Sequence, residues 1–145
     1  MNSLVELYLK IKSFAEGHNM VSGFAILKNE DDISTREFDY KQLLIIPSEA
    51  NISRDLNSPV YTLDFGCLIV DRIMMNDDLS YVSIVQENLF IIGQLQDYLI
   101  KEGYDVNFED IDISSGESED YNISAAICDF SVVLARKPYY LDTDM

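Results

Sequence analysis

The sequence has little of the residue types that build common catalytic and cofactor sites. It contains no tryptophan, one histidine (His18) and two cysteines among 145 residues. A single histidine limits His-based catalysis to one base, and no zinc-type spacing of Cys and His is present. The glycine-rich loops that bind phosphates or dinucleotides and the nucleophile elbow of hydrolases are also absent. We therefore predict that the chain is not an enzyme and uses no cofactor or metal.

Long apolar runs are also absent from the sequence, and we predict no secretory leader. The uncharged apolar runs of the chain, such as 43–47 and 89–93, are far shorter than the ~20 residues that cross a bilayer. The N-terminal apolar stretch contains Glu6 and has neither a basic region nor a cleavage site, which is typical of a helix of the mature protein. Cys67 and Cys128 lie in apolar, strand-like patterns, as reduced core cysteines do. These features predict a soluble protein that is made in the cytoplasm and has no disulfide.

Positive charge is scarce. The chain has 10 Lys and Arg against 26 Asp and Glu, which gives a formal net charge of −16. Proteins that bind DNA or RNA tightly neutralise phosphates with cationic side chains, so an extended surface of this chain would repel nucleic acid. We therefore do not expect tight binding of DNA or RNA. The same charge suits either simple solubility or a surface that DNA must pass without adhering.

Hydrophobic periodicity predicts two helices and five strands. The helices are expected over 3–17 and 77–102, the second ending at Gly103, and the strands over 20–27, 40–46, 60–73, 106–113 and 122–136. The strand over 40–46 is expected to finish at Pro47, which has no N–H to donate. In 60–73 one face begins polar and becomes apolar, which indicates that one end is covered. This order predicts a single α+β domain over 1–145, with an antiparallel sheet of long strands and two principal helices packed on it.

Three polar segments are expected on the surface. Residues 48–59 form an exposed loop without periodicity, 114–120 form an acidic hairpin loop, and 137–145 form a C-terminal tail. Adjacent tyrosines follow Pro138, and tyrosines at a terminus either anchor a partner or fold back on their own core. The candidate subunit contacts are Asn51, Ile52, Arg54, Leu56, Tyr139, Tyr140 and Leu141.

One string has some character of a metal site. Asp110, Asp112 and Ser114 alternate as do the first ligands of a calcium loop. The required glycine would fall one residue before Gly116, and Tyr121 occupies the twelfth position, where a bidentate glutamate belongs. A strand that enters a solvated hairpin explains the same spacing, so we predict no calcium site.

The remaining candidates for chemistry are weak. Asp64 and Asp71 share one predicted strand and Asp129 lies on another, so they are candidates for an acid–base pair, but nothing else in the sequence supports it and we interpret them as outward-facing strand residues. His18 directly follows the first helix, where a histidine caps the helix or faces solvent.

Several strings, in their order, resemble a known group of proteins. They are the N-terminal helix SLVELYLKIKSFAE, the strand ending LLIIP, the alternating strand VYTLDFGCLIVDRI, the helix SYVSIVQENLFIIGQLQDYL and the late strand AAICDFSVVLA. With these strings the chain resembles, over most of its length, the tail-terminator and head-to-tail connector proteins of tailed bacteriophages, especially the neck ring proteins of crAss-like phages. The resemblance implies a subunit of a closed ring, a hexamer or dodecamer, in the neck or tail of a virion.

Such a ring would be made in the host cytoplasm, would contact adjacent portal, neck or tail proteins, and would let DNA pass without sequence-specific binding. The negative charge fits a channel wall, and the 48–59 loop and the C-terminal tail are the segments expected to order against neighbours. Two rivals remain open. One is a small acidic adaptor or inhibitor that mimics DNA and binds a basic partner. The other, which we do not expect, is a hydrolase that uses strand carboxylates.

Overall fold

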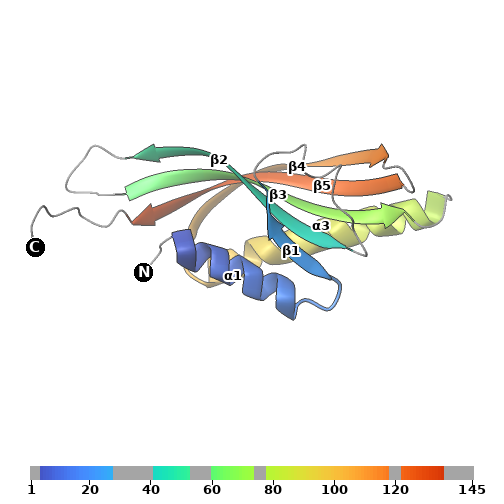
Figure 1. Cartoon of the computed structure of the whole chain (residues 1–145), viewed down its shortest axis with the longest axis horizontal. Helices are drawn as coiled ribbons and strands as arrows, with labels where there is room; N and C mark the ends of the chain where they lie inside the picture. The colour runs from blue at the N-terminus through green and yellow to red at the C-terminus, as the bar shows by residue number, and fades with distance from the viewer. Residues whose placement is uncertain (1–3, 28–40, 53–59, 74–77, 118–121, 136–145) are drawn as a thin grey trace, which may run out of the picture.

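A computed structural model describes residues 4–27, 41–52, 60–73, 78–117 and 122–135. The chain runs α1 (Leu4–Gly17), β1 (Gly23–Ile26), β2 (Gln42–Ile52), β3 (Val60–Ile73), α3 (Asp78–Lys101), β4 (Asp105–Glu117) and β5 (Asn122–Ala135). The five strands form one sheet in the order β1-β2-β3-β5-β4. Both helices lie on one side of it, α3 against β3, β4 and β5 and α1 against β1 and α3 (Figure 1). The predicted α+β class is confirmed.

The sheet is mixed, and the prediction that it is antiparallel is wrong for one pair. β1 runs parallel to β2, with Gly23 opposite Gln42 and Ile26 opposite Ile45, whereas all other neighbours are antiparallel. Short links favour antiparallel neighbours, but 15 residues separate Ile26 from Gln42 in the sequence. A connection of that length is long enough for the crossover that parallel strands require.

Two predicted strand ends are also wrong. β2 continues through Pro47 to Ile52, so residues 48–52 are strand and not loop. Beyond Ile45, β2 has β3 on one side and no described strand on the other, and an edge position tolerates the missing N–H of Pro47. The register shifts between Pro47 and Glu49, as at a β-bulge. Likewise, β4 extends to Glu117, so residues 114–117 belong to a strand of the hairpin and not to its loop.

The core has a cluster on each face of the sheet. Alternate residues of β3, Phe65, Cys67 and Ile69, point toward the helices and pack with buried residues of α1 and α3. The intervening residues Leu68 and Val70 belong to a second buried cluster on the opposite face. The second cluster also contains Leu27, Leu44 and Ala125. The prediction that one end of β3 is covered on its outer face is therefore confirmed.

α3 ends where the sequence predicts, just before Gly103. Gly103 has a φ of +90°, a left-handed conformation that glycine adopts without a clash at Cβ. Its N–H donates to the carbonyl of Ile100 at 3.0 Å, and the N–H of Tyr104 donates to the carbonyl of Leu99 at 3.1 Å. These bonds satisfy two of the carbonyls that a helix leaves free at its C-terminus, and they turn the chain into β4.

One charged group lies in the interior between β2, β3 and α3. Lys41 is only 4% exposed, and its Nζ contacts Asp71 Oδ2 at 2.9 Å and Glu87 Oε1 at 3.4 Å. The same Nζ donates to Asn88 Oδ1 at 2.5 Å. The buried ammonium group is therefore compensated by two carboxylates and an amide, as burial of a charge requires.

The cysteines are neighbours in space. Cys67 on β3 lies directly opposite Cys128 on β5, and both are buried free thiols. Burial raises the pKa of both thiols, and for Cys67 the charge of a neighbouring Cys128 thiolate would raise it further. The prediction that they are core residues is confirmed.

Candidate functional site

The outer face of α3 carries an apolar stripe. Leu79, Val82, Phe90 and Ile100 are 78, 56, 62 and 58% exposed. At 100° per residue these four side chains fall within about 80° of the helix circumference, on the side opposite the buried Leu95. Gln86, Gly93 and Asp97 lie in the same arc and interrupt the row. Large apolar side chains gathered on one exposed face mark an interaction surface more often than isolated ones do. We call these four residues the α3 stripe.

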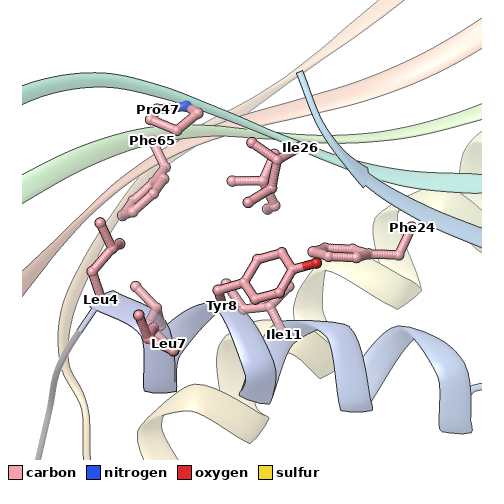
Figure 2. Close-up of a pocket in the computed structure, with 10 residues that line it drawn as sticks. Leu4, Leu7, Tyr8, Ile11, Phe24, Ile26, Pro47 and Phe65 are labelled. Carbon is pink, nitrogen blue, oxygen red and sulfur yellow. The ribbon is translucent and has the colours of Figure 1, made fainter. Parts of the chain in front are cut away.

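A second apolar surface lies between α1 and the sheet edge (Figure 2). It is a groove of about 180 Å³, and every side chain that lines it is apolar or aromatic. Tyr8 of α1 faces Phe24 of β1, with ring centroids 5.6 Å apart. The other lining residues are Leu4, Val5, Leu7, Ile11, Ile26, Ile45, Pro47 and Phe65. We call this the α1 groove.

The sheet face turned away from the helices is acidic toward one end. A hollow of about 360 Å³ is lined by the carboxylates of Glu49, Asp64, Glu109 and Asp129, from four different strands. Gly66 contributes no side chain there, and a Cβ at this position would meet Asp129 Oδ1 at 3.4 Å. The exposed apolar surfaces described above therefore lie on the helical layer, whereas the hollow on the opposite sheet face combines four carboxylates with apolar residues such as Leu68 and Ile127.

The predicted carboxylate candidates separate in the structure. Asp64 and Asp129 share the acidic hollow, because Asp129 lies opposite Gly66, two residues from Asp64. Asp71 points to the other face, where it pairs with Lys41. Asp110 and Asp112 of the calcium-like string lie on β4. Within the ranges that the structure describes, no three Asp, Glu, His or Cys side chains are arranged to hold a metal ion.

The predicted contact residues are only partly described. Asn51 and Ile52 lie on β2, opposite Thr62 and Tyr61 of β3, and Asn51 is exposed. The other five predicted contacts are outside the described residues. They are Arg54, Leu56, Tyr139, Tyr140 and Leu141.

His18 connects the two helices. Its Nδ1 accepts a hydrogen bond from the N–H of Met20 at 3.1 Å, so the proton is on Nε2, which donates to Gln94 Oε1 of α3 at 2.6 Å. Its ring also lies 5.5 Å from that of Phe14. The side chain is half-buried, so the prediction of a capping or solvent-exposed residue captures the contact with the turn but misses the link to α3.

The α3 stripe and the α1 groove were not predicted from the sequence. For the stripe a signal was present: Leu79, Val82, Phe90 and Ile100 fall on one side of the predicted helix, away from the inward-facing set, although polar residues share that side. The groove had no local signal, because its lining comes from four elements that only the tertiary fold brings together.

Comparison with known proteins provides no assignment. No family model matches the chain, and no curated protein matches it. Among the described residues, no helix is both long and apolar enough to cross a membrane. Proposals about function therefore rest on the surfaces described above.

Proposed function

We propose that this chain is a structural subunit of a ring in the neck or tail of a tailed bacteriophage, as a head-to-tail connector or tail terminator that forms part of the DNA passage. The observation that carries the proposal is the separation of two surfaces: an apolar stripe on the helical layer and a cluster of carboxylates on the opposite sheet face. A ring subunit around DNA needs both a cohesive surface and a surface that repels phosphate.

The α3 stripe supports the cohesive part. Burying the exposed portions of its four side chains contributes on the order of 5 kcal/mol, at about 1.5–3 kcal/mol for each fully exposed side chain. Association itself costs about 4–15 kcal/mol in lost translational and rotational freedom. The stripe alone is therefore a weak contact, and a closed ring requires a second contact on each subunit.

The acidic hollow supports the passage. Glu49, Asp64, Glu109 and Asp129 lie on the face that carries neither α1 nor α3. A ring whose lumen carried these carboxylates would repel the phosphates of a passing duplex, and DNA would slide without binding.

The test is the oligomeric state of the full-length protein, measured by light scattering and by electron microscopy of negatively stained particles. We expect a closed ring of six or twelve copies, and we expect added salt to strengthen it because each copy carries a charge of −16. Phe90→Ser should weaken the ring, whereas Leu9→Ser, on the exposed side of α1, should leave it intact. Chains that stay monomeric, even when mixed with the portal, neck and tail proteins of the same particle, would count against the proposal.

The acidic hollow also favours a second candidate, an adaptor or inhibitor of the DNA-mimic type that binds a basic partner. Four carboxylates around one depression suit a lysine or arginine side chain. The two candidates respond to salt with opposite sign, because added salt would weaken a complex held by opposite charges. A one-to-one complex that dissociates as salt rises, and that Asp64→Asn and Asp129→Asn weaken, would favour this candidate.

A further inference from the structure

The α1 groove has the size and chemistry to receive an aromatic side chain. Its volume of about 180 Å³ is slightly larger than an engineered apolar cavity of about 150 Å³ that binds benzene. Its lining offers apolar side chains and the rings of Tyr8, Phe24 and Phe65. An occupant with one or two aromatic rings would satisfy this lining, because rings pack favourably in offset or tilted pairs.

The chain itself supplies such an occupant. Ten residues, RKPYYLDTDM, follow the end of β5 at Ala135, and Tyr139 and Tyr140 stand side by side among them. A tyrosine ring is apolar in body and polar at its tip, so it can enter an open groove with its hydroxyl toward water. We propose that the α1 groove of one subunit receives the Tyr139–Tyr140 segment of a second copy of this chain. The proposal rests on the ring-subunit function and names its second contact.

Reach favours a second copy over the same chain. Ala135 lies opposite Val60, and Phe65, at the near rim of the groove, is five residues further along β3, about 17 Å at about 3.3 Å per residue. Ile26, on the far side of the groove, lies level with Cys67, seven residues along β3 from Val60. It is also three strands away from β5 across the sheet, at about 4.8 Å per strand, so it is about 27 Å from Ala135.

The tail of the same chain is too short to fill the groove. Tyr139 is four residues and Tyr140 five residues beyond Ala135, so even full extension carries their Cα atoms at most about 14 and 18 Å. The tail would also have to reverse the direction of β5. A tyrosine side chain adds about 6 Å, so even a fully extended tail would bring a ring only into the Phe65 side of the groove and short of Ile26, whereas the tail of a neighbouring copy can approach from the open side.

A contact of this kind is heterologous. The groove of each copy is engaged by the tail of the next, so each copy offers one donor and one acceptor surface. Repetition of a heterologous contact produces a ring when the rotation closes. The groove and the tail would then supply the second contact that the weak α3 stripe requires.

The first experiment titrates a fluorescein-labelled RKPYYLDTDM peptide against the full-length Tyr139→Ser/Tyr140→Ser protein, whose own tail cannot compete. We expect saturable binding. Leu4→Glu should weaken it by at least about tenfold, because it places a carboxylate in the apolar lining. Leu9→Glu is the matched control, since Leu4 and Leu9 are 44 and 51% exposed on the same helix and only Leu4 lines the groove.

The peptide experiment has clear contrary outcomes. Absence of binding, equal effects of Leu4→Glu and Leu9→Glu, or equal binding of a peptide with both tyrosines replaced by serine would overturn the proposal.

The second experiment decides between a neighbouring tail and the chain's own tail. The Leu4→Glu protein has an intact tail and an impaired groove. The Tyr139→Ser/Tyr140→Ser protein has an intact groove and an impaired tail. We expect neither to form rings alone and an equimolar mixture to form two-chain complexes through one intact contact. The contrary result is a mixture that contains no two-chain complexes, together with a Tyr139→Ser/Tyr140→Ser protein that loses thermal stability at all concentrations. In that case the tail binds the groove of the same chain and the proposal is wrong.

The two proposals can fail separately. Rings that persist in Leu4→Glu and Tyr139→Ser/Tyr140→Ser would leave the ring function standing and remove the groove contact. Specific peptide binding by a protein that forms no ring and enters no particle would support the groove contact and remove the ring function.

Discussion

Replacing the buried ammonium group of Lys41 is the most direct test of how the interior is held together. In Lys41→Met the side chain stays long and apolar, but Asp71 loses the cation 2.9 Å from its carboxylate and Asn88 Oδ1 loses its donor. Removing one partner of a buried ion pair costs about 3–5 kcal/mol when the other is left buried and unpaired.

The cost of leaving Asp71 without its cation is smaller than this, because the side chain is only partly buried. Its side chain is 19% exposed, and its Oδ1 accepts a hydrogen bond from the N–H of Arg72 at 2.8 Å. Water and the backbone can therefore compensate part of the loss, and we expect Lys41→Met to cost about 2–3 kcal/mol. For a chain of this length that corresponds to a fall in Tm of about 5–10 °C.

The assay is urea unfolding followed by far-ultraviolet circular dichroism, because the chain has no tryptophan to report on its fold. Glu87→Gln is the internal control: Glu87 is 45% exposed and 3.4 Å from Lys41, so its loss should cost less than about 1 kcal/mol. In a double-mutant cycle, Lys41→Met and Asp71→Asn should couple by about 1.5 kcal/mol or more. Additive effects, or a Lys41→Met protein as stable as Glu87→Gln, would refute the reasoning.

Two further predictions concern the thiols and the end of α3. Burial raises the pKa of Cys67 and Cys128, so we expect Ellman's reagent to label neither thiol at pH 8 until urea unfolds the chain. The free energy of unfolding should fall as pH rises above the ordinary thiol pKa of 9.0, because the unfolded chain then releases protons that the folded chain retains; a native thiol that reacts at pH 8 would contradict this. Gly103→Ala should lower the free energy of unfolding by about 1 kcal/mol, because alanine is strained at a φ of +90°. Gly93→Ala should raise it by about 0.5–1 kcal/mol, because Gly93 lies within α3 and a Cβ there would meet no atom within 4 Å. Equal urea midpoints for the two variants would contradict the left-handed cap.

Local patterns account for most element boundaries. β3 was predicted over 60–73 and is observed over Val60–Ile73, because the apolar residues that recur at every second position from Tyr61 to Ile69 mark a strand without knowledge of its partners. α3 ends as expected at Gly103, because a left-handed cap is a property of a few adjacent residues. β2 was predicted too short, because the effect of Pro47 depends on whether a strand lies beside it.

The sequence by itself determined the α+β class, the long strands, the two helices and the net negative charge, because hydrophobic periodicity and charge depend only on the order and type of the residues. Tertiary structure alone decided that β1 runs parallel to β2, that Lys41 meets Asp71, and that Leu4, Phe24 and Phe65 enclose one groove. The physical reason is that hydrophobic burial drives apolar surfaces together without direction. Which distant residues meet is therefore set by the closure of loops and the register of strands, and not by any local pattern.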